Sequence, residues 1–135
     1  MTATLVDSCV LLDVVTEDSQ WFEWSACTLA DAAARGMLVI NAVIYAEVSI
    51  GFRRIEELES VLPAGYFELR AIPREAAFLA GKCFLEYRRR GGVRHSLLPD
   101  FFIGAQAAVE SLDLLTRDVA RYRTYFPGLR LVTPF

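Results

Sequence analysis

Residues 4–15 have the sequence TLVDSCVLLDVV, a short apolar run followed directly by an aspartate and a serine. Asp and Ser are preferred at the N-cap of a helix, because their side-chain oxygens accept hydrogen bonds from amide groups of the first turn. The apolar residues after Asp7 recur with helical spacing. The segment therefore predicts a strand at 4–6 that passes straight into a helix ending near Val15, the opening unit of an α/β fold.

The rest of the chain repeats this alternation of short apolar runs and longer helical patterns. Further strands are expected at 38–40, 66–72, 113–116 and 129–132. Helices are expected at 20–35, around 45–48, and at 53–62, 73–90, 99–111 and 117–125. Strands joined by helical crossovers form parallel sheets with helices on both faces. We therefore expect a single domain over 1–135, a three-layer α/β sandwich around a parallel sheet of about five strands.

Composition limits the classes of function. The hydrophobic fraction of 54% allows a core without disulfides or a structural metal. A formal net charge of −3 is not that of a dedicated DNA-binding domain, although a carboxylate site becomes less acidic once metal ions bind. Cys9, Cys27 and Cys83 form no CxxC pair, which argues against a thiolate zinc site and favours core positions. The sequence shows no signal-peptide pattern and no membrane-spanning stretch, so we expect a cytoplasmic protein.

Four acidic residues stand where they are expected to meet at one edge of the sheet. Asp7 follows the first strand and Asp118 the fourth, and the carboxyl ends of parallel strands share an edge. Glu47 lies in the helix after the second strand and Asp100 begins a later helix, so both can converge there. Carboxylates brought together repel one another and require protons or a cation. Oxygen ligands alone favour Mg²⁺ or Mn²⁺, which can activate water for in-line attack on a phosphodiester.

Each acid also has a purely structural interpretation. The three aspartates are each compatible with a helix cap or a turn. Glu47 is harder to explain in this way, since it interrupts an apolar helix in which an unpaired charge is costly. Its structural alternative is an ion pair with Arg53 or Arg54.

The segments that carry the four acids share a form, in which apolar residues surround a single acid or an acid with a neighbouring hydroxyl. They are LVDSCVLLD at 5–13, NAVIYAEV at 41–48, LPDFFIGAQA at 98–107 and LLTRD at 114–118, with a closing segment YRTYFPGLRLV at 122–132. In this order they resemble the motifs of PIN-domain ribonucleases, specifically the VapC-type toxins of bacterial type II toxin–antitoxin pairs, and the resemblance covers the whole chain. Two positions depart from it: Cys9 stands where the family often has Asn or Ser, and Gly104 where Ala is commoner.

The resemblance implies a PIN-like fold and a metal-dependent endoribonuclease that hydrolyses RNA phosphodiesters with a metal-activated water, its cofactor being Mg²⁺ or Mn²⁺. It makes Asp7, Glu47, Asp100 and Asp118 the catalytic set, two or three of which bind the metal. It also implies a homodimer and a cognate protein antitoxin. The antitoxin's tail would cover the active-site groove and often inserts a basic residue among the acids.

Other residues are weaker candidates for the site. Ser8 and Thr116 adjoin acids, where they either orient a carboxylate or a water, or serve as cap and turn hydroxyls. Four arginines are candidates for contact with RNA phosphates, with a solvated position as the alternative. They are Arg117 beside Asp118, and Arg88, Arg89 and Arg90 in the densest basic run.

Two further features bear on partners and chemistry. Four apolar residues belong either to a partner groove or to a second helical layer: Phe52, Ile55, Leu58 and Val61. His95 is the only histidine and is expected in a surface loop. A histidine pair for acid–base catalysis within one chain is therefore excluded.

Three rival functions remain open at this stage. A phospho-accepting receiver domain would need an Asp after the third strand and a Lys near the last strand. Instead Pro73 and Arg74 follow the third strand, and Lys82 lies within a predicted helix. A non-catalytic PIN-like binding protein would be separated from a nuclease by metal titration. A housekeeping RNA-processing nuclease would be separated from a toxin by the absence of a short antitoxin gene just upstream.

Overall fold

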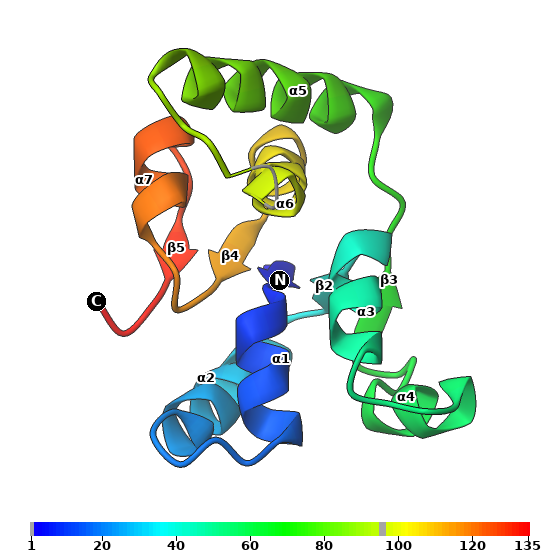
Figure 1. The fold of residues 1–135 in the computed structure, drawn as a ribbon. Coiled ribbons are helices and arrows are strands. Elements are labelled where there is room, and N and C mark those ends of the chain that lie inside the picture. The colour runs from blue at the N-terminus through cyan, green and yellow to red at the C-terminus, as the bar shows by residue number, and fades with distance from the viewer. Residues whose placement is uncertain (1, 95–96) are drawn as a thin grey trace.

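The structure, a computed structural model, describes residues 2–94 and 97–135 and contains a parallel sheet (Figure 1). The strands are β1 (Thr4–Val6), β2 (Leu38–Ile40), β3 (Phe67–Leu69), β4 (Asp113–Leu115) and β5 (Leu131–Val132). They pair in the order β3-β2-β1-β4-β5, and every pairing is parallel. The predicted α/β architecture with a five-stranded parallel sheet is therefore confirmed.

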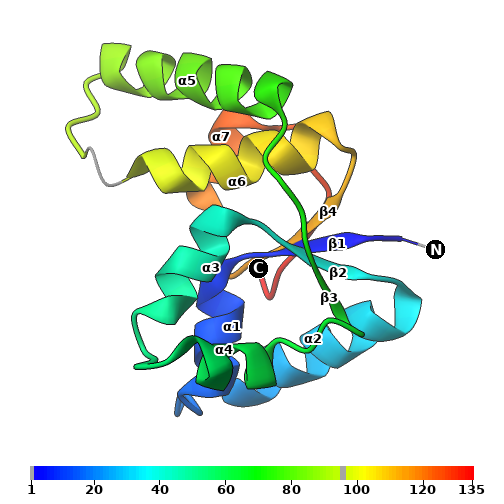
Figure 2. The same ribbon diagram turned by 90° about the vertical axis from the view of Figure 1, so that its right-hand side faces the viewer.

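Helices cover both faces of this sheet. They are α1 (Ser8–Val15), α2 (Phe22–Arg35), α3 (Ala42–Ser49), α4 (Ile55–Val61), α5 (Arg74–Arg89), α6 (Leu98–Val109) and α7 (Ala120–Tyr125). Figure 1 shows α1 and α2 on one side of the sheet and α5 and α6 on the other. In Figure 2, α5 lies along the outer side of α6, so α6 is enclosed between α5 and the sheet.

The central strands form because their residues are apolar on both faces, apart from Thr4 and Asp113 at the starts of β1 and β4. All residues of β1, β2 and β4 are buried, and a continuous apolar run is typical of a parallel strand covered on both sides. The edge strands β3 and β5 are shorter than the predicted 66–72 and 129–132. Each has a hydrogen-bonding neighbour on one side only. Hydrogen bonds to that neighbour still include Tyr66 and Arg70 beside β3 and Arg130 beside β5, and the other predicted residues lie beyond them.

Several helices also begin later than predicted. Before α2, the Asp18 carboxylate accepts hydrogen bonds from the amides of Gln20 and Trp21, which holds those residues in a turn. The helix expected at 53–62 is α4, which begins at Ile55, and the helix expected at 117–125 is α7, which begins at Ala120. As a result Arg117 and Asp118 lie in the loop after β4.

The order of the strands reverses beside β1. This strand pairs with β2 on one side and with β4 on the other. The connections that follow β1 and β4 therefore diverge from adjacent strand ends. Such a switch point leaves a crevice at the carboxyl ends of the strands, where α/β proteins commonly bind ligands.

Some expectations about single residues were wrong or fall outside the description. Cys27 is exposed on α2, although Cys9 and Cys83 are partly buried, so the expected core position is wrong for Cys27. His95 and Ser96 lie outside the described residues, as does Met1. Among the helices of residues 2–94 and 97–135, none has the length and apolar character needed to cross a membrane.

Gly104 allows two aromatic rings to pack against α6. A Cβ at this position would lie 2.5 Å from Cε2 of Phe126 and 3.1 Å from Cδ1 of Tyr122. Both of those side chains are buried. Close packing of these rings therefore explains why this position is glycine and not alanine. The hydroxyl of one of the two rings, that of Tyr122, donates a hydrogen bond to Asp7.

Replacing Gly104 with Ala should lower the free energy of unfolding by about 1–3 kcal/mol, because overpacking outweighs the better helix propensity of Ala. Urea unfolding measures this change. Gly81→Ala on α5 is the matched control, since a Cβ there meets nothing within 4 Å. It should stabilise the protein by up to about 1 kcal/mol, and effects of the same sign at both positions would contradict the packing argument.

Candidate active site

Asp7 lies at the switch point, directly after β1, and caps α1. Its Oδ1 accepts a hydrogen bond from the amide of Ser8 at 2.8 Å. Its Oδ2 accepts hydrogen bonds from the hydroxyls of Thr116 at 2.8 Å and Tyr122 at 3.1 Å. The side chain is only 5% exposed. Asp7 is therefore a helix cap, as its structural interpretation predicted, and also a buried carboxylate held by two hydroxyls from the β4–α7 region.

Glu47 is held by Ser8, which joins α1 to α3. The Ser8 hydroxyl donates to Oε1 of Glu47 at 2.9 Å. Within the described residues Glu47 forms no ion pair with Arg53 or Arg54, and Arg54 instead lies 3.6 Å from Glu56. The ion-pair alternative for Glu47 is therefore wrong. Its carboxylate faces the end of β1 because Ser8 follows Asp7 directly.

Asp100 and Asp118 share a single arginine. Nε and Nη2 of Arg121 donate to Oδ2 of Asp100 at 3.0 and 2.7 Å. Nη2 also donates to Oδ2 of Asp118 at 2.5 Å. Asp100 lies in the first turn of α6, and Asp118 lies in the loop before α7. The arginine thus links the start of α6 to the start of α7.

Burial and mutual repulsion raise the pKa values of three of these acids. Burial raises the pKa of Asp7 to about 6, and repulsion from Asp100 adds to this effect. Burial also raises the pKa of Glu47, again with repulsion from Asp100. The pKa of Asp100 is raised by burial and by repulsion from Asp118, although Arg121 opposes the shift. Asp100 is thus within electrostatic reach of the other three acids.

The donor chemistry of this cluster fits a hard divalent cation. Carboxylate and hydroxyl oxygens are the groups that such ions prefer, and the raised pKa values mark negative charge that the protein compensates only in part. As the side chains stand, however, no three Asp, Glu, Cys or His residues of the described chain converge closely enough to hold one ion. Asp100 and Asp118 are turned toward Arg121. A cation would therefore have to draw at least one of them away.

Three residues of the cluster's surroundings were missed by sequence reasoning. Arg121 and Tyr122 contact the acids directly. Gln106 is fully buried, and its Oε1 accepts a hydrogen bond from the side-chain amide of Asn41 at 2.8 Å. This bond links the helix that carries Glu47 to the helix that carries Asp100. The sequence did contain a signal for Arg121. It lies three residues after Asp118 near the start of a helix, and residues at that spacing lie on the same face of a helix. Gln106 was signalled by a polar residue within the apolar run at 98–107.

The solvated alternative for Arg117 is wrong. Its guanidinium donates to both carboxylate oxygens of Asp13, at 2.6 Å from Nε and 2.9 Å from Nη2. It also lies over the ring of Trp21, 5.0 Å from the centroid. Asp13 is 3% exposed and accepts a further hydrogen bond from Ser25. Arg117 therefore anchors the loop between β4 and α7 to α1 and α2.

The basic run lies at the exposed C-terminal end of α5. Arg88, Arg89 and Arg90 are all exposed, and Arg90 pairs with Glu86 at 3.0 Å. The guanidinium of Arg88 lies 6.0 Å from the ring centroid of Phe84. Figure 2 shows that this end of α5 and the start of α6, which carries Asp100, lie at the same end of the molecule. Contact of these arginines with RNA stays a prediction.

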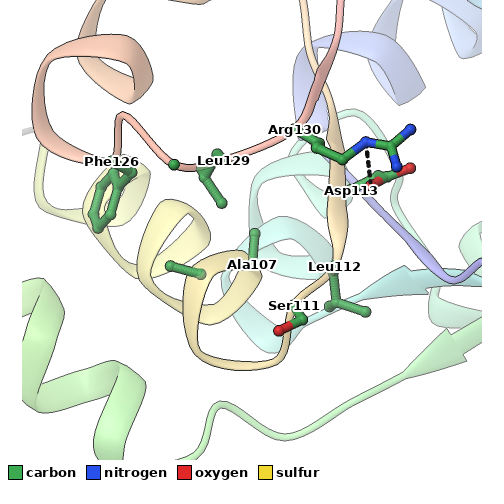
Figure 3. Close-up of a pocket in the computed structure, with 9 residues that line it drawn as sticks. Ala107, Ser111, Leu112, Asp113, Phe126, Leu129 and Arg130 are labelled. Carbon is green, nitrogen blue, oxygen red and sulfur yellow. Dashed lines mark ion pairs between the residues drawn. The ribbon is translucent and has the colours of Figure 1, made fainter.

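A separate pocket lies at the other edge of the sheet. Its volume is about 330 Å³, and it lies beside the start of β4 (Figure 3). Ala107, Leu112 and Leu129 supply much of its apolar lining, and an ion pair of 3.5 Å joins Arg130 to Asp113 on its rim. The acids follow the strand ends, whereas Asp113 begins a strand, so this pocket is distinct from the acidic cluster.

The chain is similar to known proteins in both sequence family and fold. The chain matches the PIN domain family over residues 4–127. It is similar in structure to VapBC2 from Rickettsia felis bound to a DNA fragment from their promoter, with 17% identity, a TM-score of 0.74 and 98% of each chain covered. It is also similar to FitAcB from Neisseria gonorrhoeae, with 19% identity, a TM-score of 0.71 and 97% of each chain covered.

A toxin–antitoxin complex from Klebsiella pneumoniae has 23% identity, a TM-score of 0.71 and 98% coverage of each chain. At these identities the structural likeness is one of fold. No curated protein sequence is significantly similar to this chain.

Proposed function

The chain belongs to the PIN domain family, and from this premise we propose that residues 1–135 form a single-domain, metal-dependent endoribonuclease. The observation that carries the proposal is the position of the acids. Ser8 contacts both Asp7 and Glu47, and Arg121 contacts both Asp100 and Asp118, at the carboxyl edge of the sheet. Burial raises the pKa values of Asp7, Glu47 and Asp100. A cluster of this kind suits hydrolysis of a phosphodiester with Mg²⁺ or Mn²⁺ as cofactor.

In this proposal Asp7, Glu47, Asp100 and Asp118 are the catalytic residues, and two or three of them hold the cation. When bound, a divalent ion supplies Lewis-acid stabilisation of a phosphoryl oxygen and a lower pKa for water. The protein's part is to fix the carboxylates. Thr116 and Tyr122 fix Asp7, and Ser8 fixes Glu47.

The depth of Asp7 also matters to this mechanism. Because its side chain is 5% exposed, the surrounding medium screens its charge weakly, and electrostatic interactions there are stronger than in water. Asp118 is the most exposed of the three candidate aspartates, with its side chain 47% accessible. An RNA phosphate would therefore approach from the side of Asp118, and Asp7 would be one of the residues that hold the ion.

The test is cleavage of structured RNA by purified protein. We expect cleavage with Mg²⁺ or Mn²⁺, loss of cleavage with EDTA, and recovery when metal is added in excess. An Asp7→Asn variant carried through the same purification excludes a contaminating nuclease. Cleavage that EDTA does not reduce would contradict the metal-dependent mechanism.

We further propose that the enzyme is a VapC-type toxin that acts in the cytoplasm, pairs with a protein antitoxin and forms a homodimer. Support for the antitoxin comes from the structural neighbours, one of which is a toxin–antitoxin complex. A hollow of about 270 Å³ between α3 and α4 offers a place for part of such a partner, lined by Tyr45, Phe52 and Ile55 among others. Ile55 is 62% exposed, whereas Leu58 is buried in the core.

A housekeeping RNA-processing nuclease is the alternative that would use the same catalytic mechanism. The toxin would be favoured by a short gene directly upstream whose product binds this chain. That product should also relieve the growth arrest that expression of this chain causes. A non-catalytic binding protein is the other alternative, and it predicts no cleavage at any metal concentration.

A further inference from the structure

Arg121 is a cation already bound at the acidic cluster. Its Nε and Nη2 both donate to one oxygen of Asp100, at 3.0 and 2.7 Å. Nη2 reaches Asp118 as well, at 2.5 Å. The arginine side chain is 24% exposed and that of Asp100 is 23% exposed, so water screens this contact less than an ion pair on the open surface.

We propose that Arg121 is a built-in counter-cation that competes with the divalent ion for Asp100 and Asp118. The inference rests on the proposed function, since it concerns how this chain's own residues receive the metal. The positive charge of the guanidinium repels an incoming cation, and its two hydrogen bonds occupy Oδ2 of Asp100, so ligation by that oxygen requires Arg121 to move. A guanidinium keeps its charge at every physiological pH, so the competitor is displaced only by movement of Arg121 and not by loss of a proton.

The four acids of the cluster fall into two pairs, according to the charge of the groups that donate hydrogen bonds to them. Asp7 and Glu47 accept hydrogen bonds from hydroxyls and a backbone amide, which are neutral donors. Asp100 and Asp118 accept from a guanidinium. An entering ion would gain Asp7 and Glu47 without breaking an ion pair, whereas ligation by Oδ2 of Asp100 would break the ion pair with Arg121. Arg121 therefore lowers metal affinity and compensates the acids when no ion is bound.

Isothermal titration of the purified full chain with Mn²⁺ tests this competition without reference to activity. Arg121→Met removes the charge while keeping much of the side-chain length. We expect it to bind Mn²⁺ about tenfold more tightly than the wild type, equivalent to about 1.4 kcal/mol. Arg121→Lys keeps the charge but lacks the fork that reaches two carboxylates, so its affinity should lie between the two.

Arg123→Met is the matched control, because it removes the same charge from the same helix. Arg123 contacts the backbone oxygen of Phe135 at 3.2 Å rather than an acid of the cluster. Its variant should bind Mn²⁺ with the wild-type affinity. An equal gain in both variants would overturn the proposal, since the effect would then be one of net charge alone.

Other outcomes separate this inference from the proposed function. Binding by Arg121→Met that is equal to or weaker than the wild type would overturn the inference and leave the metal site intact. Absence of Mn²⁺ binding in every protein would overturn both. Should Arg121→Met fail to fold, the Nε–H resonance of Arg121 in the wild type gives the answer. It should shift on addition of Mg²⁺, and an unchanged resonance in metal-saturated protein would overturn the proposal.

Discussion

Asp7→Asn should lower metal-dependent RNA cleavage by about a thousandfold or more. The substitution preserves the size of the side chain and an oxygen that can accept the hydrogen bond from the Ser8 amide. It removes a negative charge at the deepest of the four acids, where weak screening makes that charge most effective. The loss should appear in the rate at saturating metal, measured by time courses of RNA cleavage, and not only in metal affinity.

Asp113→Asn is the matched control for this variant. Asp113 is also buried, at 7% exposed, but it begins β4, whereas Asp7 follows β1. Its variant should cleave RNA at nearly the wild-type rate. Asp7→Asn protein that is folded and retains a tenth or more of the activity would show that Asp7 is a structural cap and not a catalytic residue.

The part of the fold that could be predicted from sequence is the part fixed by local pattern. β1 and β2 are apolar except at Thr4, and all of their residues are buried because both faces of each strand are covered. Each strand is followed at once by a capping residue, Asp7 or Asn41. The limits of β3 and β5 could not be predicted. They depend on a single neighbouring strand, which a linear pattern does not reveal.

The positions of the acids could be predicted for a related reason. Strand ends in a parallel sheet share an edge, so Asp7 and Asp118 were placed together without knowledge of the strand order. The strand order itself, with β1 between β2 and β4, followed from no local signal. It is this order that brings Thr116 within 2.8 Å of Asp7.

The partners of the acids were the least predictable features. Arg117 and Asp13 are far apart in the sequence, and the pairing depends on where the loop after β4 meets α1 and α2. The hydrogen bond from Tyr122 to Asp7 depends in turn on ring packing over Gly104. Such contacts are consequences of the assembled tertiary structure, and a residue type at a given spacing does not determine them.

The metal-free protein should lose stability as the pH rises from about 4 to 7, and Asp7 should account for much of the loss. Its pKa in the folded protein is raised by burial from 3.8 to about 6. A carboxyl group with a raised pKa favours the folded state when protonated. Its stabilising effect is complete below pH 3.8 and is lost as the pH passes through 6. The difference corresponds to about 3 kcal/mol.

Urea unfolding in EDTA at a series of pH values, for the wild type and Asp7→Asn, isolates this effect. Glu47 and Asp100 also have raised pKa values, but both remain in the variant, so the difference between the two proteins reports Asp7. We expect similar stability near pH 4 and a variant more stable by about 3 kcal/mol near pH 7. Saturating Mg²⁺ should reduce that gap, because a cation stabilises the ionised carboxylate. A gap that is constant across pH would mean that Asp7 is ionised at little cost, and the main electrostatic reason for a cation at this edge of the sheet would then be absent.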